Sequence, residues 1–355
     1  MGLFPVVANE NLKQKYTDAK SLKFGKLFTD YMLTWQYTTG QGWHDGKIEP
    51  YADFKMDPAS MVLHYGQAIF EGLKAYKRAD GKTLLFRARD NFRRMNASAE
   101  RLCMPTLDVE QAYEGLCELL RIEDAWIPDT PGTSLYIRPT MIATDPFLGV
   151  KASDNYLFFI ILSPVGPYYP EGFNPVKIYV ENDYVRAVKG GTGTTKSAGN
   201  YAASILAGEQ AKHSGYTQVL WLDGVHRRYI EEVGAMNIFF RFRDELVTPA
   251  LAGSILAGIT RSSILTLAQD MGLKVSERAV AIDEVFDAHD RGDLLEVFGS
   301  GTAAVVSPVG EMKWQDRTIT INGNRTGELA QKLYDQLTGI QLGKVADPHG
   351  WVTVV

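Results

Sequence analysis

Hydrophobic and polar positions follow short strand-like runs along the first half of the chain. The segments "LTWQY", "KTLLF" and "SLYIRPTMIAT" are rich in β-branched and aromatic residues, as strands are, and "YLFFIIL" (156–162) is typical of a buried strand. By contrast, "ARDNFRRMNASAERL" places Phe92, Met95 and Leu102 along one face at helical spacing. This half is therefore expected to mix strands and helices.

The second half shows the same mixture after a clear seam. The segment "SPVGPYYPEGFNP" (163–175) contains four prolines and two glycines and predicts a linker. Beyond it, "VKIYV", "TQVLWLD" and "NIFFRF" predict strands. Helices are expected in "NYAASILAGEQAKHSG", from about Thr260 to Met271, and in "GELAQKLYDQL". We expect an α+β fold with a small N-terminal α/β domain (1–165), an interdomain loop (166–175) and a larger C-terminal domain (176–355).

Composition narrows the class of protein. A chain of 355 residues with 45% hydrophobic and 22% charged residues suits a globular enzyme of two domains. The net charge of −5, with no basic stripe, argues against a nucleic-acid partner. The cysteines, Cys103 and Cys117, form neither a CxxC motif nor a zinc spacing. With no signal-peptide pattern and no apolar run long enough for a bilayer, we expect a cytoplasmic protein without a membrane partner or metal site.

One lysine stands in the glycine-rich segment "GGTGTTKSAGNY" (190–201). The P-loop pattern G-x-x-x-x-G-K-[ST] fits residues 190–197 except at Thr195, which replaces the second glycine. A dinucleotide-binding G-x-G-x-x-G fails because Lys196 stands at the third glycine. The missing glycine would let the chain turn with positive φ, so both mismatches are substantive. A flexible loop with an incidental lysine is the remaining explanation from this segment alone.

Three other segments could serve the chemistry of that lysine. Glu232 precedes a glycine and a buried-looking strand in "EEVGAMNIFF", although a carboxylate there is usually a solvated turn residue. In "LAGITRSSIL", Ile259 and Thr260 begin a helix, where N–H groups and a hydroxyl can bind a phosphate, although Thr260 could equally be an ordinary N-cap. "VFGSGTAAVV" ends a strand in a small-residue turn that exposes backbone donors.

Together these segments supply what pyridoxal 5′-phosphate requires of a protein. The cofactor needs a lysine for a Schiff base, an acid for its ring nitrogen and an anchor for its phosphate. An ordinary lysine, with a pKa of about 10.4, is almost wholly protonated at pH 7. Small uncharged neighbours that desolvate an amine favour its neutral, nucleophilic form.

The motifs also resemble a known family. "GGTGTTKSAGNYAAS", "EVGAMNIF", "AGITR" and "FGSGTA" are similar to the signature blocks of branched-chain amino acid aminotransferases, which are fold-type IV pyridoxal-phosphate enzymes of the class IV aminotransferase family. "LHYGQAIFEGLKAY" (63–76), "RDNFRRMNASAERL" and "YIRPTMIATDPFLGV" resemble further blocks, in the same order along nearly the whole chain. The resemblance implies a two-domain fold-type IV architecture with the active site between the domains, a cofactor-binding C-terminal domain and a homodimer.

The resemblance implies roles for individual residues. Lys196 would form the Schiff base and carry protons, and Glu232 would pair with the pyridinium nitrogen. Arg138 would receive the distal carboxylate of glutamate or 2-oxoglutarate. The remaining cofactor contacts would come from Arg94, Ile259 and Thr260 at the phosphate, Arg186 and Tyr201 beside the cofactor, and Thr302 at the phosphate or, with Ala303, at the substrate carboxylate. The aromatic cage for aliphatic side chains, partly supplied by a partner subunit, would comprise Phe24, Tyr65, Phe70, Tyr136 and Tyr168.

Three positions depart from the family pattern. Ala198 replaces a glycine of the usual pair after the lysine, and Ala235 replaces a threonine, which removes one hydroxyl near the substrate. Ala304 and Ser307 stand where some mammalian members have a redox CxxC motif, so thiol regulation of that kind is not expected.

The expected activity is transamination in two half-reactions. The amino group of leucine, isoleucine or valine passes to 2-oxoglutarate, giving the 2-oxo acid and glutamate, as in branched-chain amino acid biosynthesis. A D-amino acid transaminase or an aminodeoxychorismate lyase of the same fold is the alternative enzyme, although these are typically shorter chains. A P-loop nucleotide-binding protein and a non-enzymatic pyridoxal-phosphate carrier are the alternatives from other classes.

Overall fold

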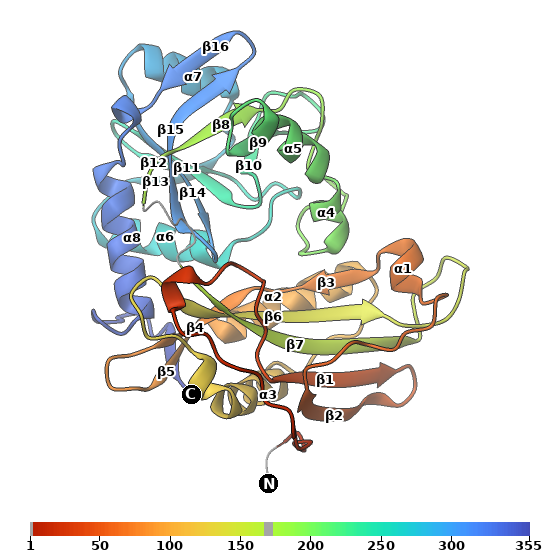
Figure 1. The fold of residues 1–355 in the computed structure, drawn as a ribbon. Coiled ribbons are helices and arrows are strands. Elements are labelled where there is room, and N and C mark those ends of the chain that lie inside the picture. The colour runs from red at the N-terminus through yellow and green to blue at the C-terminus, as the bar shows by residue number, and fades with distance from the viewer. Residues whose placement is uncertain (1–2, 167–172) are drawn as a thin grey trace. The chain divides into compact units, whose positions relative to one another are not determined.

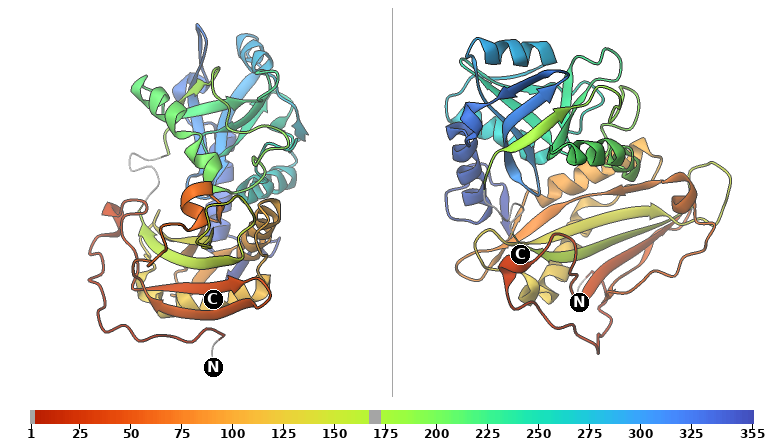
Figure 2. Two further views of the ribbon diagram at one scale, coloured as in Figure 1. Left: turned by 90° about the vertical axis from the view of Figure 1, so that its right-hand side faces the viewer. Right: turned by 45° about the horizontal axis from the view of Figure 1, so that its top comes forward.

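The computed structural model describes residues 3–166 and 173–355, which fall into two compact units. Unit 1 comprises Met1–Pro170, Thr195–Gly199 and Gly339–Val355, and unit 2 comprises Glu171–Thr194 and Asn200–Thr338. Each unit contains its own sheet and its own helices (Figure 1, Figure 2). Most of the expected interdomain loop, including Tyr168, lies outside the described residues, and the domain boundaries stay a prediction.

The sheet of unit 1 has eight strands among the described residues. Their order is β17 (Val352–Val354), β5 (Thr83–Phe86), β4 (Leu73–Lys77), β6 (Ser134–Ala143), β7 (Asn155–Val165), β1 (Tyr31–Thr38) and β2 (Gly42–Pro50), and β3 (Ala68–Phe70) pairs with β6. All of these neighbouring strands run antiparallel. The strands expected from the sequence at β1, β5, β6 and β7 are confirmed.

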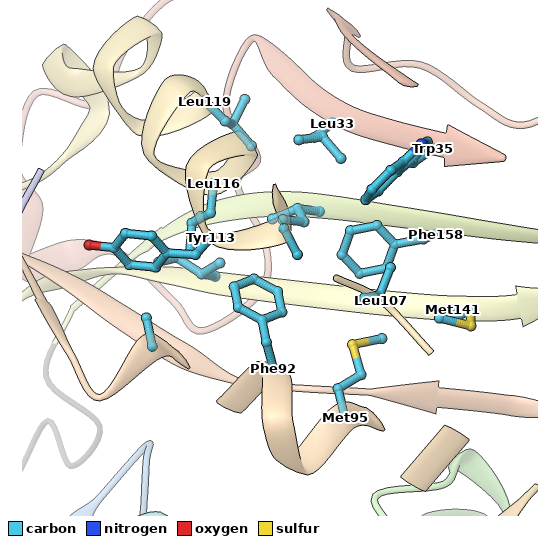
Figure 3. Packing of buried hydrophobic residues seen from close by; sticks show 14 of the residues in the cluster. Leu33, Trp35, Phe92, Met95, Leu107, Tyr113, Leu116, Leu119, Met141 and Phe158 are labelled. Carbon is cyan, nitrogen blue, oxygen red and sulfur yellow. The ribbon is translucent and has the colours of Figure 1, made fainter. Parts of the chain in front are cut away.

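One face of this sheet carries the core of unit 1. Its strands alternate, so that Leu33, Met141 and Phe158 point into the core cluster with side chains of two helices (Figure 3). The helices of unit 1 are α1 (Met61–Tyr65), α2 (Ala88–Arg101) and α3 (Val109–Ile122), with 3₁₀ turns at Ala19–Ser21 and Asp124–Trp126. Phe92 and Met95 of α2 are fully buried in this core, as helical spacing predicts.

The face opposite the core, here called the outer face, carries Phe70, Lys74, Tyr136, Arg138 and Ser163. On β6 the side chains of Arg138 and Thr140 are only partly buried, whereas those of Ile137 and Met141 are fully buried. Successive side chains of a strand point to opposite faces, so one face of β6 packs in the core and the other carries polar and charged groups.

Unit 2 contains a nine-stranded sheet among the described residues. Its order is β10 (Ile230–Val233), β9 (Gln218–Leu222), β8 (Val176–Val180), β15 (Val305–Trp314), β14 (Leu294–Gly301), β11 (Asn237–Phe242), β12 (Leu246–Pro249) and β13 (Val275–Arg278), and β16 (Arg317–Thr320) pairs with β15. The helices are α4 (Ala198–Ala202), α5 (Ile205–His213), α6 (Ile259–Asp270), α7 (Ile282–Asp290) and α8 (Glu328–Gln341), with a 3₁₀ turn at Asn322–Asn324; the start of α4 and the end of α8 belong to unit 1.

Two local expectations differ from the structure. The single helix expected over residues 200–215 is two helices, because the hydroxyl and the N–H of Ser204 both bond to the carbonyl of Tyr201 and close a turn there. The seam expected from Ser163 begins later, because β7 continues through Pro164 to Val165. Proline is tolerated there because β1 pairs with β7 only as far as Ile160 and leaves that side of Pro164 unpaired in the ladder.

None of the helices in the described part of the chain combines the length and apolarity required to cross a membrane.

Candidate active site

The loop that carries Lys196 is closed at its base by one side chain. The amide of Asn200 donates to the carbonyl of Thr192 (2.8 Å) and its oxygen accepts from the Thr192 hydroxyl (2.6 Å). Gly193 lies so close to the carbonyl of Ser254 that a Cβ would stand 2.1 Å from that oxygen. The glycine-rich composition therefore reflects close packing of backbone at Gly193 as well as turning of the chain.

The backbone of Lys196 is held on both sides within unit 1. Its N–H donates to the hydroxyl of Ser98 on α2 (3.0 Å), and its carbonyl accepts from the N–H of Phe70 on β3 (3.0 Å). The Nζ atom lies 4.9 Å from the centroid of the Phe70 ring, a cation–π distance. Lys196 is therefore positioned by its main chain, and its amine rests on an aromatic face.

A buried carboxylate that the sequence reading did not single out lies beside these residues. Glu71 is fully buried and binds Arg94 at two points, from Nε to Oε1 (2.7 Å) and from Nη2 to Oε2 (2.8 Å). Asn91 donates to Oε2 as well (2.8 Å). Burial alone would raise the pKa of Glu71, but the charge and hydrogen bonds of Arg94, with Lys196 and Asn91, outweigh burial and hold that pKa below its usual value.

Arg94 itself, expected at the phosphate, is thus largely buried in an ion pair, with a side chain that is 12% exposed. The available sequence signal for Glu71 was one charged residue inside the apolar run "AIFEGL". A charge in that setting is rarely buried without a partner, and its partner was 23 residues away.

Three expected aromatic residues and one expected arginine meet on unit 1. The rings of Phe24 and Tyr136 are 4.7 Å apart, and the Arg138 guanidinium lies 4.5 Å from the Phe70 centroid. Arg138 donates from Nη2 to the Tyr136 hydroxyl (3.1 Å). An apolar wall and a fixed cation therefore share one surface. Tyr65 lies on α1 instead, where its hydroxyl donates to the carbonyl of Leu148.

Glu232 is the anchored acid of unit 2. It is only 3% exposed, and its Oε2 lies 2.7 Å from Nε of Arg186. Its Oε1 accepts from Asn237 (3.2 Å) and from the N–H of Leu256 (3.0 Å). These contacts fix the carboxylate of Glu232 in one orientation, so it is suited to pair with a cationic group. The solvated turn residue that Glu232 could have been is excluded.

Arg186 also fixes the backbone around this acid. Its Nη2 donates to the carbonyls of Ser254 (2.5 Å) and Gly193 (3.1 Å). The Ser254 hydroxyl donates in turn to Glu231, whose pKa is raised by burial despite that bond and the charge of Arg186. Glu231 is a second buried acid that the sequence reading did not single out.

The expected phosphate helix begins one residue earlier than Thr260. Gly258 is the N-cap of α6 and provides no side-chain cap, and a Cβ there would stand 2.0 Å from Oδ1 of Asn237. Ile259 and Thr260 are thus the first two helical residues, and the N–H groups at these positions are ones that the ladder of an α-helix does not use. Thr260 is not the cap itself.

The remaining expected residues occupy a turn and a short helix. Thr302 and Ala303 lie in the turn between β14 and β15, next to Ser300, whose buried Oγ has no hydrogen-bond partner in the described structure. Tyr201 lies on α4.

The comparisons agree with this architecture. The sequence model of the amino-transferase class IV family matches residues 68–312. The chain is 58% identical over 343 residues to branched-chain-amino-acid aminotransferase 2 of Bacillus subtilis (strain 168), covering 97% of this chain and 94% of that protein. It is 54% identical over 339 residues to branched-chain-amino-acid transaminase 1 of the same organism, covering 95% of each.

A solved structure is similar as well. The branched-chain amino acid aminotransferase of Escherichia coli gives a TM-score of 0.75 at 27% identity and covers 91% of this chain and 98% of that one. The likeness supports the α+β, fold-type IV expectation. The chain therefore belongs to the class IV aminotransferases, and among them to the branched-chain-amino-acid aminotransferases.

Proposed function

We propose that this chain transfers the amino group of leucine, isoleucine or valine to 2-oxoglutarate, with pyridoxal 5′-phosphate as its cofactor. The observation that carries the proposal is the main-chain clamp on Lys196, which holds one amine above the Phe70 ring on the surface shared with Arg138. Family membership and the names of the relatives favour this activity over a D-amino acid transaminase, an aminodeoxychorismate lyase or a P-loop protein.

The donor set fits the cofactor. When bound, pyridoxal 5′-phosphate supplies an electron sink that makes the α-hydrogen of an amino acid acidic. Glu232, a buried carboxylate fixed by Arg186, is suited to pair with a protonated pyridine nitrogen. Gly258 adds no side-chain cap at the start of α6, where the N–H groups of Ile259 and Thr260 suit a phosphate.

Other roles at the cofactor follow from residue chemistry. Arg94 would bind the phosphate, with its guanidinium held in one direction by Glu71. Arg186 and Tyr201 would stand beside the cofactor, and Thr302 would contribute a hydroxyl at the phosphate or, with Ala303, at the substrate carboxylate.

Lys196 moves the proton. With the cofactor bound, its Nζ would accept the α-hydrogen of the substrate as a general base and return it as a general acid. The Ser98 and Phe70 backbone contacts keep the lysine main chain still, so that only the side chain has to move.

The substrate side chain lies against the aromatic wall. Phe24, Phe70 and Tyr136 offer apolar surface to leucine, isoleucine or valine, and Arg138 binds the distal carboxylate of 2-oxoglutarate. Tyr65 and Tyr168 are the other aromatic residues proposed for this cage, and Tyr168 lies outside the described residues.

A second copy of this chain is the proposed partner. On unit 1, Leu63, Phe147, Leu148 and Val150 are exposed apolar residues, and the Tyr65–Leu148 hydrogen bond joins the two segments that carry them. Such a cluster marks a protein interface. Leu148→Asp is expected to shift the sedimentation mass from twice the 39.5 kDa chain to one chain; a monomeric wild-type protein would contradict the homodimer.

The proposed compartment is the cytoplasm. Cys103, which is exposed, and Cys117, which is buried, are both free thiols in the structure, as suits a reducing environment.

The test is an absorbance spectrum with three proteins. Wild-type protein loaded with pyridoxal 5′-phosphate is expected to show a visible band that leucine removes and 2-oxoglutarate restores. Lys196→Ala is expected to lose this response, whereas Lys212→Ala, a lysine on α5 whose side chain is 76% exposed, keeps it. A wild-type protein that takes up no cofactor would overturn the proposal.

A further inference from the structure

Three residues form a row across the outer face of the unit 1 sheet. Lys74 on β4 is the direct partner of Tyr136 on β6, and Tyr136 is the direct partner of Ser163 on β7. Side chains that oppose one another in a sheet lie on the same face, about 5 Å apart at Cβ. The neighbours of Lys74 along its strand, Leu73 and Ala75, are buried in the core cluster, which confirms the direction of the row.

Arg138 lies at one side of this row. It is two residues from Tyr136 on β6 and therefore on the same face, and its Nη2 donates to the Tyr136 hydroxyl (3.1 Å). It is also the diagonal neighbour of Lys74, and diagonal neighbours stand about 7–8 Å apart, within reach of long side chains. Two cations thus flank one tyrosine.

Two polar atoms of this face have unused capacity. The Ser163 hydroxyl is buried, with the residue 4% exposed, and has no hydrogen-bond partner among the described residues. Nε of Arg138 is likewise buried without a partner in the described part of the chain. Both are donors, and buried donors are nearly always satisfied in the functional state of a protein. Their natural complement is an acceptor, such as a carboxylate.

The surroundings of Lys74 leave its amine poorly solvated. Burial lowers the pKa of Lys74 to about 8, so the amine is still mostly protonated at pH 7 while being poorly solvated. A poorly solvated ammonium gains more from a bound anion than a solvated one does. Lys77, on the same strand, forms an ion pair with Asp124.

We propose that Lys74 and Ser163, which lie on either side of Tyr136 in this row, complete the distal-carboxylate subsite to which Arg138 belongs. This rests on the proposed function, and it makes Lys74 a specificity-determining residue for the dicarboxylate partner, 2-oxoglutarate or glutamate. The aromatic residues Phe24 and Phe70 serve the aliphatic side chain on the same surface. In this proposal the aromatic residues contact the side chain of leucine, and Arg138 and Lys74 bind the distal carboxylate of 2-oxoglutarate or glutamate.

The experiment compares a dicarboxylate with a monocarboxylate. Lys74→Met removes the charge and keeps an apolar chain, Lys74→Arg keeps the charge, and Lys77→Met is the matched control on the same strand. The KM values for 2-oxoglutarate and for 4-methyl-2-oxopentanoate are measured with each holoenzyme. For Lys74→Met we expect the KM for 2-oxoglutarate to rise about tenfold, as loss of a charged hydrogen bond implies, and that for 4-methyl-2-oxopentanoate to stay within about twofold.

The controls separate the possible outcomes. Lys74→Arg is expected to retain most of the preference for 2-oxoglutarate, Lys77→Met to behave as wild type, and Ser163→Ala to weaken 2-oxoglutarate selectively, by a few-fold. The proposal is overturned if Lys74→Met weakens both oxo acids equally, or neither. If Lys74→Met does not fold, Ser163→Ala and Lys74→Arg carry the same comparison. Failure of wild-type protein to react with leucine would instead contradict the proposed function.

Discussion

Arg94 and Glu71 form a two-point ion pair inside unit 1, with Nε–Oε1 and Nη2–Oε2 distances of 2.7 and 2.8 Å. Glu71 is fully buried and the Arg94 side chain is 12% exposed, so both charges are poorly solvated. Paired charges of this kind depend on each other, since removal of one leaves the other buried and uncompensated. The residue proposed for the cofactor phosphate is therefore held by a carboxylate of its own unit.

Glu71→Gln is expected to lower the free energy of unfolding at pH 7 by about 3 kcal/mol, because the Arg94 charge stays buried without its partner. Urea unfolding measures the change. Arg93→Gln is the control, since Arg93 on the same helix pairs with Asp90 at a side-chain exposure of 61% and is expected to cost less than about 1 kcal/mol. Equal losses in the two variants would contradict the special position of Glu71.

The contribution of Glu71 should depend on pH in one direction. Its pKa in the folded state lies below the ordinary value of 4.5, so the stability it provides is complete above that pH and is lost as the pH falls through the folded-state pKa. The difference in unfolding free energy between wild type and Glu71→Gln is therefore expected to shrink in acid. A difference that grows below pH 4.5 would show that Glu71 is not held as a carboxylate.

Glu123 is predicted to change the stability of the fold with pH in the direction opposite to Glu71. Burial first, and then the neighbouring Asp30, raises its pKa from 4.5 to about 7, against the opposing hydrogen bond that it accepts from the N–H of Tyr31. Between these two values the folded state binds more protons than the unfolded state, so stability falls as the pH rises through this window. Glu123→Gln keeps an acceptor for Tyr31 and should be more stable than wild type at pH 8, by up to about 3 kcal/mol.

The measurement is thermal or urea unfolding between pH 4.5 and 8. Glu110→Gln on α3, with a side-chain exposure of 57%, is the control and should follow the wild-type curve. A Glu123→Gln variant with the same pH slope as wild type would refute the assignment.

The sequence predicted the local part of this site and missed the non-local part. The helices around Phe92 and Thr260 and the strands depend on spacing within one segment. The importance of Lys196 and Glu232 came from combining several segments and from the family resemblance. Glu71 and Lys74 could not be singled out in this way, because their significance comes from Arg94 and Tyr136, which other segments bring beside them. Pairing between strands is not visible in the period of one strand.

Two elements were predicted wrongly, each for a different reason. The helix expected over 200–215 satisfied helical spacing, but the Ser204 hydroxyl competed for the backbone and divided it. Pro164 looked like part of a linker, yet it lies in β7 because its neighbour β1 ends before reaching it.

Gly193 is predicted to tolerate no side chain. Gly193→Ala would place a methyl group 2.1 Å from the Ser254 carbonyl and 2.6 Å from Cβ of Ala187, and should cost about 1–3 kcal/mol of unfolding free energy. Gly208→Ala is the matched control, because that position lies in α5 with open space around its Cβ and should be neutral or slightly stabilising. Equal stability of the two variants would refute the close packing of the lysine loop.

Arg186→Lys tests whether the guanidinium fork is required around Glu232. One ammonium cannot match a planar fork that reaches Glu232, the Ser254 carbonyl and the Gly193 carbonyl together. Glu232 would keep a positive neighbour but lose its fixed orientation. We expect the Kd of the cofactor-free protein for pyridoxal 5′-phosphate to rise by about tenfold, as the loss of one charged hydrogen bond implies.

The control for this variant is Arg227→Lys, because Arg227 bonds only to the carbonyl of Asn182 among the hydrogen bonds described and lies at an exposed site. Its Kd for pyridoxal 5′-phosphate should equal that of wild type. Quenching of tryptophan fluorescence on titration measures both variants without turnover, which separates cofactor binding from catalysis. An unchanged Kd in Arg186→Lys would mean that charge alone at this position orients Glu232, and that the fork serves only the backbone of the lysine loop.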